Sequence, residues 1–201
     1  MNYPALITSL MDTDLYKLTM LQAFFHAPEF RSVEVEWKFA CRNRHGFDLA
    51  AQISEIRQQL EEVCRLRFAD EELDYLATFP FFTPDFIEFL RIYQLNMRFV
   101  SIRPMGEDID LRIRGPLIHV ALFEIYVLAI ISEIHTRVIC GDVDDAIASA
   151  RLQEKVAYLQ GQEPLTGFGF ADFGTRRRAS KQWQEKALTL LLDQIPRYFV
   201  G

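Results

Sequence analysis

Three consecutive arginines, Arg176, Arg177 and Arg178, end the heptapeptide Asp-Phe-Gly-Thr-Arg-Arg-Arg at residues 172–178. Residues 167–172 are predicted to form a short buried strand, and apolar residues recur at helical spacing across 178–195. The arginines therefore fall at a predicted helix N-terminus, where the macrodipole makes each cation unfavourable by roughly 0.3–1 kcal/mol. A bound phosphate or carboxylate would offset this cost, because helix N–H groups and guanidinium groups bind anions. Ion pairs with the chain's own carboxylates are the equally weighted alternative.

The composition limits the classes of function. A chain of 201 residues, 50% hydrophobic and 25% charged, is long enough for one or two domains with a real core. The net charge of −6 argues against nucleic-acid binding, which makes the arginine cluster a local exception. Cys41, Cys64 and Cys140 form no CxxC pair, so we expect a reducing cytoplasm and no zinc site. The first residues carry no signature of a secretory signal.

The most apolar stretch, 117–134, contains His119, Glu124 and Glu133. A glutamate in mid-span is costly in lipid, so we predict a buried helix and no membrane association. The two glutamates are nine residues apart, about 180° out of phase on a helix. They are therefore not expected to serve one site as a pair.

The order of elements changes near Gly115. Before it, the pattern predicts a helix to about 26, an alternating strand over 33–41, a turn at 43–46, helices over 48–66, 70–78 and 84–94, and a hairpin of 97–103 with 109–114. After it come a long buried helix (117–138), an amphipathic helix (143–160), the strand 167–172, the helix 178–195 and a short strand at 198–200. A right-handed parallel crossover should join the two strands.

We therefore predict an α/β protein with residues 1–115 as an α+β N-terminal domain and residues 116–201 as the first helices and first β/α unit of a truncated β/α barrel. A single βαβ unit leaves strand edges and apolar faces uncovered. The sequence is therefore expected to be part of a larger chain.

Three segments together identify a family. Asp-Thr-Asp-Leu-Tyr-Lys at 12–17, Cys-Arg-Asn-Arg at 41–44 and the heptapeptide at 172–178 resemble, in order and spacing, the nicotinate phosphoribosyltransferases. The resemblance covers the whole sequence and implies an irregular barrel of the type II phosphoribosyltransferase kind. Members of the family are about twice as long, so the resemblance is to their N-terminal half.

The resemblance also implies an activity. Nicotinate and phosphoribosyl pyrophosphate would give nicotinate mononucleotide and pyrophosphate in NAD biosynthesis, coupled to ATP hydrolysis with Mg²⁺, which places the enzyme among the ligases. It further implies a cytoplasmic homodimer with composite active sites. The isolated half is expected to be inactive, because the residues that grip the sugar phosphate lie outside it.

Four substrate-binding residues follow from the resemblance. Phe173 matches the aromatic residue that stacks on the pyridine ring, and Tyr16, from the neighbouring subunit, matches its opposite partner. Arg176 matches the arginine that engages the ring's acyl group, and Asp14 belongs to the motif of Tyr16. Stacking of this kind contributes on the order of 0.5–1.5 kcal/mol per pair beyond area.

Phosphate binding is implied for Arg42, across the dimer interface, and less strongly for Arg177 and Arg178. No catalytic residue and no metal ligand is assigned in this half. For each residue, ordinary packing or a solvated charge is the alternative. At the level of function, the alternatives are a nicotinamide phosphoribosyltransferase and a non-catalytic module for anion binding or dimerisation.

Overall fold

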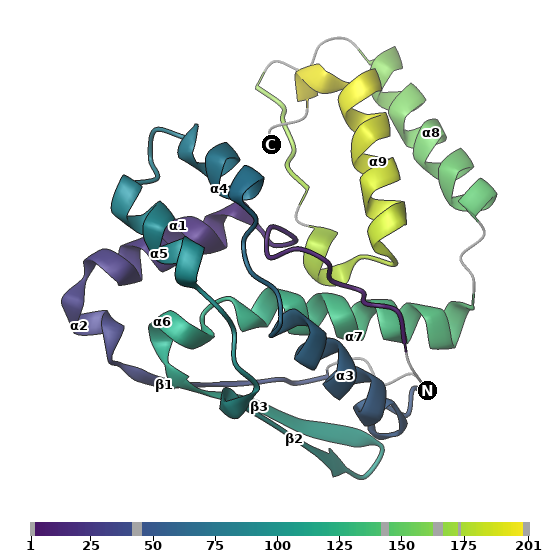
Figure 1. Ribbon diagram of the computed structural model, residues 1–201. Coiled ribbons are helices and arrows are strands. Elements are labelled where there is room, and N and C mark those ends of the chain that lie inside the picture. The colour runs from purple at the N-terminus through teal and green to yellow at the C-terminus, as the bar shows by residue number, and fades with distance from the viewer. Residues whose placement is uncertain (1–2, 42–45, 142–144, 163–166, 173, 199–201) are drawn as a thin grey trace. The chain divides into compact units, whose positions relative to one another are not determined.

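The computed structural model describes residues 3–41, 46–141, 145–162, 167–172 and 174–198 (Figure 1). The chain divides into two compact units, Met1–Ile131 and Ser132–Gly201, called here the first and second units. The predicted domain boundary at residue 115 stays a prediction.

A three-stranded antiparallel sheet organises the first unit (Figure 1). Its strands are β1 (Glu34–Lys38), β2 (Val100–Met105) and β3 (Asp108–Pro116), in the order β1-β3-β2. β2 and β3 form the predicted hairpin, with Ile102 opposite Leu111. Gly106 has φ +64° in the short turn between them, a conformation that glycine adopts without strain. The central strand, β3, buries alternate side chains, as its sequence pattern predicts.

Gly115 lies inside β3, opposite Val35, although the sequence pattern suggested a break there. A Cβ at this position would stand 2.5 Å from Cδ1 of Phe99. The glycine therefore serves close packing of an aromatic ring on the strand, and the strand continues to Pro116.

Helices pack around this sheet to form the core of the first unit. They are α1 (Leu15–His26), α2 (Pro28–Arg31), α3 (Ile53–Val63), α4 (Asp70–Ala77), α5 (Pro84–Ile92) and α6 (Leu117–Val120), with 3₁₀ turns η1 (Ala50–Gln52) and η2 (Met97–Phe99). Phe86, Phe123 and Tyr126 are among the largest fully buried side chains. The Tyr126 hydroxyl donates to the Leu10 carbonyl at 2.6 Å, which satisfies its polar end.

The predicted long helix over 117–138 is two helices, α6 and α7 (Phe123–Cys140), separated at residues 121–122. The segment Leu117–Cys140 has the length and a mean hydropathy, 2.0, that a membrane span would need. However, 67% of its most apolar window is buried inside the protein, and both of its glutamates form ion pairs. These are features of a core helix.

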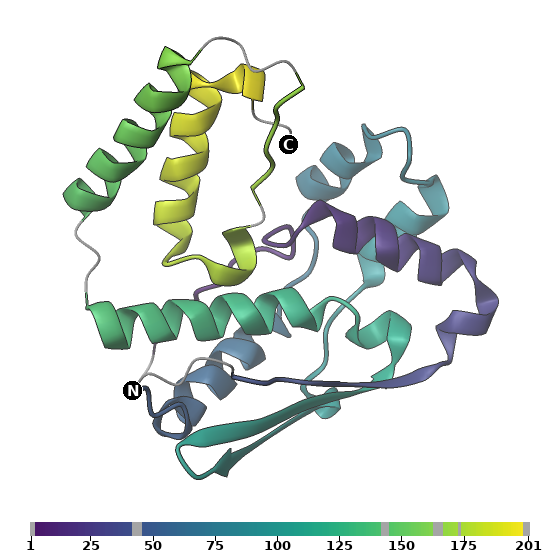
Figure 2. The ribbon, with the colours of Figure 1, turned by 180° about the vertical axis from the view of Figure 1, so that it is seen from behind.

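Two helices and two short turns follow in the second unit: α8 (Asp145–Gly161), η3 (Gly174–Arg177), α9 (Lys181–Gln194) and η4 (Pro196–Tyr198). Helices α8 and α9 lie side by side in both views (Figures 1 and 2). Val156, Ile195 and Tyr198 form the buried cluster, against which Leu159, Phe170, Leu190 and Leu191 pack.

Of the predicted strand at 167–172, the structure assigns Phe170 to a β-bridge and leaves the other described residues as turn or irregular chain. The Phe170 N–H donates to the Tyr198 carbonyl at 2.8 Å, and Tyr198 belongs to the turn η4. A strand requires ladder hydrogen bonds from a neighbour along its length. Residues 199 and 200 of the second predicted strand lie outside the described residues, so the parallel crossover stays a prediction.

Candidate functional site

Arg176 and Arg177 lie in the 3₁₀ turn η3, and Arg178 follows it directly. Contrary to the prediction, the three arginines do not begin the long helix. Helix α9 begins at Lys181, and Ser180 is its N-cap: the Ser180 Oγ accepts from the Trp183 N–H at 3.0 Å. A serine at this position is favourable and a cation is not, which explains why the arginines precede the helix start. Their exposure differs, since Arg176 is half-buried and Arg177 is exposed.

Arg178 is buried and forms an ion pair with Glu133 of α7. The two side chains are 2% and 7% exposed, and the Arg178 Nε donates to the Glu133 Oε1. The Ser132 hydroxyl also donates to the Arg178 carbonyl, at 3.1 Å. Such a pair is tolerated in the interior only when hydrogen bonds offset the desolvation of both charges. For Arg178 this is the ion-pair alternative raised by the sequence, and its role in phosphate binding stays a prediction.

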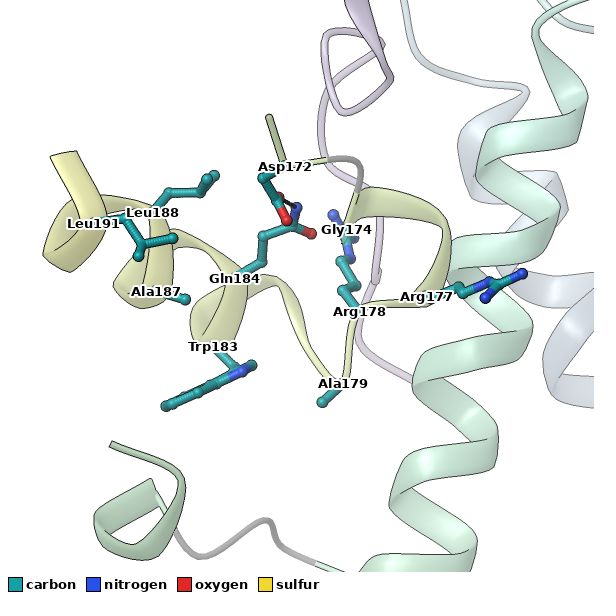
Figure 3. A pocket seen from close by; sticks show the side chains of 10 residues that line it. All are labelled: Asp172, Gly174, Arg177, Arg178, Ala179, Trp183, Gln184, Ala187, Leu188 and Leu191. Atoms are coloured by element: carbon teal, nitrogen blue, oxygen red, sulfur yellow. Dashed lines mark hydrogen bonds between the residues drawn. The ribbon is translucent and has the colours of Figure 1, made fainter. Parts of the chain in front are cut away.

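Polar contacts also hold the start of the turn. The Gln184 amide donates to the Asp172 Oδ2 at 2.7 Å. A Cβ on Gly174 would stand 2.9 Å from both Asp172 carboxylate oxygens and from the Gln184 Nε2. Figure 3 shows these two side chains meeting beside Gly174. A Cβ at 174 would therefore require these side-chain ends to shift.

A pocket of about 280 Å³ lies beside the turn (Figure 3). Polar groups of the turn line one part and the side chains of α9 line the rest: Asp172, Gly174, Arg177, Arg178, Ala179, Trp183, Gln184, Ala187, Leu188 and Leu191. Its volume is near the lower limit of ligand pockets, and it combines an indole with charged groups. The Arg177 side chain extends away from the others in Figure 3.

Tyr16 and Asp14 lie at the start of α1 in the first unit. Asp14 is buried at the N-cap position, and the residue Tyr16 is 40% exposed. Lys17 points inward, where its Nζ is 2.6 Å from the Glu124 Oε2 and 5.4 Å from the centre of the Tyr16 ring. Tyr16 is therefore partly accessible to solvent, as a stacking residue requires.

The structure thus groups the predicted site residues in two places. Arg176, Arg177 and Arg178 share one turn of the second unit, whereas Tyr16 and Asp14 share one helix start of the first. Arg42 and Phe173 lie outside the described residues. Within the part of the chain that the structure describes, no group of three or more His, Cys, Asp or Glu side chains could hold a metal ion.

The sequence did not identify the partners of these residues. Two glutamates in a very apolar helix indicate that cations are paired with them, but the spacing does not identify those cations. The structure pairs Glu124 with Lys17 and Glu133 with Arg178, which confirms that the two glutamates do not share a site. No sequence feature predicted the contact of Gln184 with Asp172, because that contact depends on how α9 packs along the turn.

Comparisons with known proteins agree with the resemblance. The protein-family model described as the nicotinate phosphoribosyltransferase (NAPRTase) N-terminal domain matches residues 11–132. A nicotinate phosphoribosyltransferase of Psychromonas ingrahamii is 64% identical over 196 residues, which are 98% of this chain and 48% of that protein. One of Burkholderia mallei is 43% identical over 199 residues, 98% of this chain and 49% of that protein.

Solved structures give the same result. The crystal structure of a nicotinate phosphoribosyltransferase from Vibrio cholerae matches with a TM-score of 0.84 and 30% identity, covering 98% of this chain and 48% of that one. That from Porphyromonas gingivalis matches with a TM-score of 0.84 and 27% identity, covering 97% and 49%. The chain spans about half the length of the relatives it matches.

Proposed function

The chain belongs to the nicotinate phosphoribosyltransferase family, and from this premise we propose that it forms part of an enzyme that makes nicotinate mononucleotide and pyrophosphate from nicotinate and phosphoribosyl pyrophosphate. The observation that carries the proposal is the 64% identity to a nicotinate phosphoribosyltransferase across 98% of this chain. The proposed role is in NAD biosynthesis, with ATP hydrolysis coupled to the transfer.

We assign the ring of nicotinate to Tyr16 and Phe173 and its carboxylate to Arg176. A guanidinium suits a planar carboxylate because it can donate two parallel hydrogen bonds. The half-buried position of Arg176 supports this role, since a partly desolvated cation binds an anion more strongly than a fully solvated one. Arg42 and the exposed Arg177 are the proposed phosphate-binding residues.

The transfer needs no covalent nucleophile from the protein. Its transition state is expected to carry positive charge on the sugar while pyrophosphate departs. Catalysis then depends on holding the ring nitrogen near the anomeric carbon and on stabilising the leaving group. Mg²⁺ and ATP are proposed as cofactors of the whole enzyme, and no residue described here is assigned to hold them.

A homodimer with Tyr16 acting from the neighbouring subunit is part of the proposal. The exposure of Tyr16 supports it. A cytoplasmic location is also proposed, in keeping with three free cysteines.

The decisive experiment measures conversion of labelled nicotinate to its mononucleotide, with phosphoribosyl pyrophosphate, Mg²⁺ and ATP. The purified 201-residue chain is compared with a chain extended to the length of its relatives, and labelled nicotinamide is assayed in parallel. We expect product from nicotinate with the extended chain only. Preference for nicotinamide would indicate the related amide-using enzyme, and absence of product from both substrates would favour a non-catalytic module.

The carboxylate assignment is tested with Arg176→Ala in the extended chain. Losing a charged hydrogen-bond partner should lower kcat/KM for nicotinate roughly ten- to hundredfold. Arg151→Ala on α8, an exposed arginine, is the matched control and should leave it unchanged. Unchanged kinetics for Arg176→Ala would remove this residue from the site.

The composite site is tested by subunit mixing. Variants of the extended chain inactivated at Tyr16 or at Phe173 should each lose activity, and mixing them should restore part of it. Absence of recovery after verified subunit exchange would place both residues in one chain's site.

A further inference from the structure

We propose that Glu133 is a positioning residue for Arg176: its buried ion pair with Arg178 fixes the turn that presents the Arg176 guanidinium to the carboxylate of the substrate. This inference rests on the proposed function and adds to it a determinant of substrate specificity. All of the residues involved belong to the second unit.

The first step is the anchoring of Arg178. Two consecutive residues of α7 hold it: Glu133 accepts from the Arg178 guanidinium, and the Ser132 hydroxyl donates to the Arg178 backbone carbonyl. Contacts to both the side chain and the main chain fix the orientation of a residue as well as its position. Because Arg178 follows η3 directly, its anchoring fixes the end of the turn that contains Arg176.

The second step concerns the other end of the turn. Gly174, its first residue, is packed against the hydrogen-bonded side chains of Asp172 and Gln184. A 3₁₀ turn of four residues has few internal hydrogen bonds and cannot define its own geometry. The contacts at the two ends therefore fix the backbone from which the Arg176 side chain extends.

The third step asks why an ion pair, and not a pair of apolar side chains, occupies this interior position. Apolar side chains of similar volume would stabilise this interior at least as well, since both charges must be desolvated. A charge-assisted hydrogen bond provides direction that an apolar contact lacks. A buried pair next to the residue proposed to bind the carboxylate is therefore explained best by positioning.

The test uses the extended, full-length chain and three changes: Glu133→Gln, the double change Glu133→Leu with Arg178→Met, and Ser132→Ala. The double change removes both charges and so avoids an unpaired buried arginine. We expect Glu133→Gln and the double variant to raise KM for nicotinate roughly tenfold or more, because small displacements of a binding group are costly. KM for phosphoribosyl pyrophosphate should change less than about twofold, and preference for nicotinate over nicotinamide should fall.

Ser132→Ala removes one hydrogen bond and should raise KM for nicotinate roughly threefold. The matched control is Glu185→Gln on α9, which breaks an exposed pair with Lys181 (4.0 Å) in the same unit and should leave both KM values unchanged. Thermal unfolding of each variant separates a loss of fold from a loss of positioning.

A folded double variant with an ordinary KM for nicotinate would overturn the inference. If neither variant at Glu133 folds, Ser132→Ala decides, and an unchanged KM for nicotinate would overturn it equally. A wild-type enzyme that makes no nicotinate mononucleotide would instead defeat the proposed function, and the inference would fall with it.

Discussion

The two compact units differ in what holds them together. The first unit buries large apolar side chains from helices and sheet, among them Phe86, Phe123 and Tyr126. The second has a buried apolar cluster of Val156, Ile195 and Tyr198. Its arginine turn is held by an ion pair and hydrogen bonds. Apolar burial stabilises the first unit, whereas polar contacts define the local geometry of the second.

The difference bears on function. Apolar contacts have little direction, so a large core is stable without specifying the position of any one polar group. Arg176, proposed to bind the substrate's carboxylate, lies in a turn with directional contacts at both ends. Few side chains of α8 and α9 are fully buried, Val156 on α8 and none on α9, which indicates a lower local stability there.

The largest expected effect comes from the apolar cores. Phe86→Ala in α5 should lower the free energy of unfolding by about 3–5 kcal/mol, and Val156→Ala in α8 by about 2 kcal/mol. Urea denaturation measures both, and hydrogen exchange should show that Val156→Ala loosens α8 and α9 only. Tyr158→Ala, at a side chain 68% exposed, is the control. A larger loss for Val156→Ala than for Phe86→Ala would contradict the comparison.

The two ion pairs of α7 sharpen the comparison between the two units. Glu133→Gln leaves Arg178 buried without its counter-charge and should cost about 3–5 kcal/mol. Glu124→Gln should cost about 1–2 kcal/mol, because water already solvates the Glu124 side chain in part: it is 29% exposed, against 7% for Glu133. Thermal or urea unfolding measures both. The reverse order would mean that exposure does not govern the cost.

The start of α9 gives a smaller effect. Ser180→Ala removes the side-chain acceptor for the Trp183 N–H and should lower stability by about 1 kcal/mol. Ser180→Asp keeps an acceptor at the N-cap and adds a favourable charge, so it should retain wild-type stability or exceed it. Equal losses in both variants, measured by urea denaturation, would show that the cap contributes nothing here.

The smallest effect is on pH dependence in the first unit. Burial, and then the charge of Arg98, lower the pKa of His119, whose ring stacks on Phe99 at 5.9 Å. The unfolded chain then binds more protons than the folded one near the usual imidazole pKa of 6.5. The contribution of the neutral His119 to stability is therefore complete above that value, and it declines as pH falls through it toward the lowered pKa.

Urea midpoints at about pH 7.5 and about pH 5.5 should show this decline, and His119→Gln should reduce it. An identical decline in wild type and His119→Gln would assign the pH dependence to other groups.

Periodicity predicted much of the first unit. The hairpin of β2 and β3 follows from alternation around a glycine turn, and α1, α3, α4 and α5 lie close to their predicted ranges. At 167–172 only Phe170 is assigned to a β-bridge; strand formation requires a neighbouring strand, and most of the neighbour predicted at 198–200 lies outside the described residues. The prediction failed at Arg176 to Arg178, where Ser180 is the better helix start.

The sequence by itself determined the family, through three ordered motifs, and the separation of Glu124 from Glu133, because helical phase is a local property. Only the tertiary structure decided which cation each glutamate binds. Those contacts join Lys17 to Glu124 and Glu133 to Arg178 across long stretches of chain. Pairing at such separations depends on packing, which no local pattern encodes.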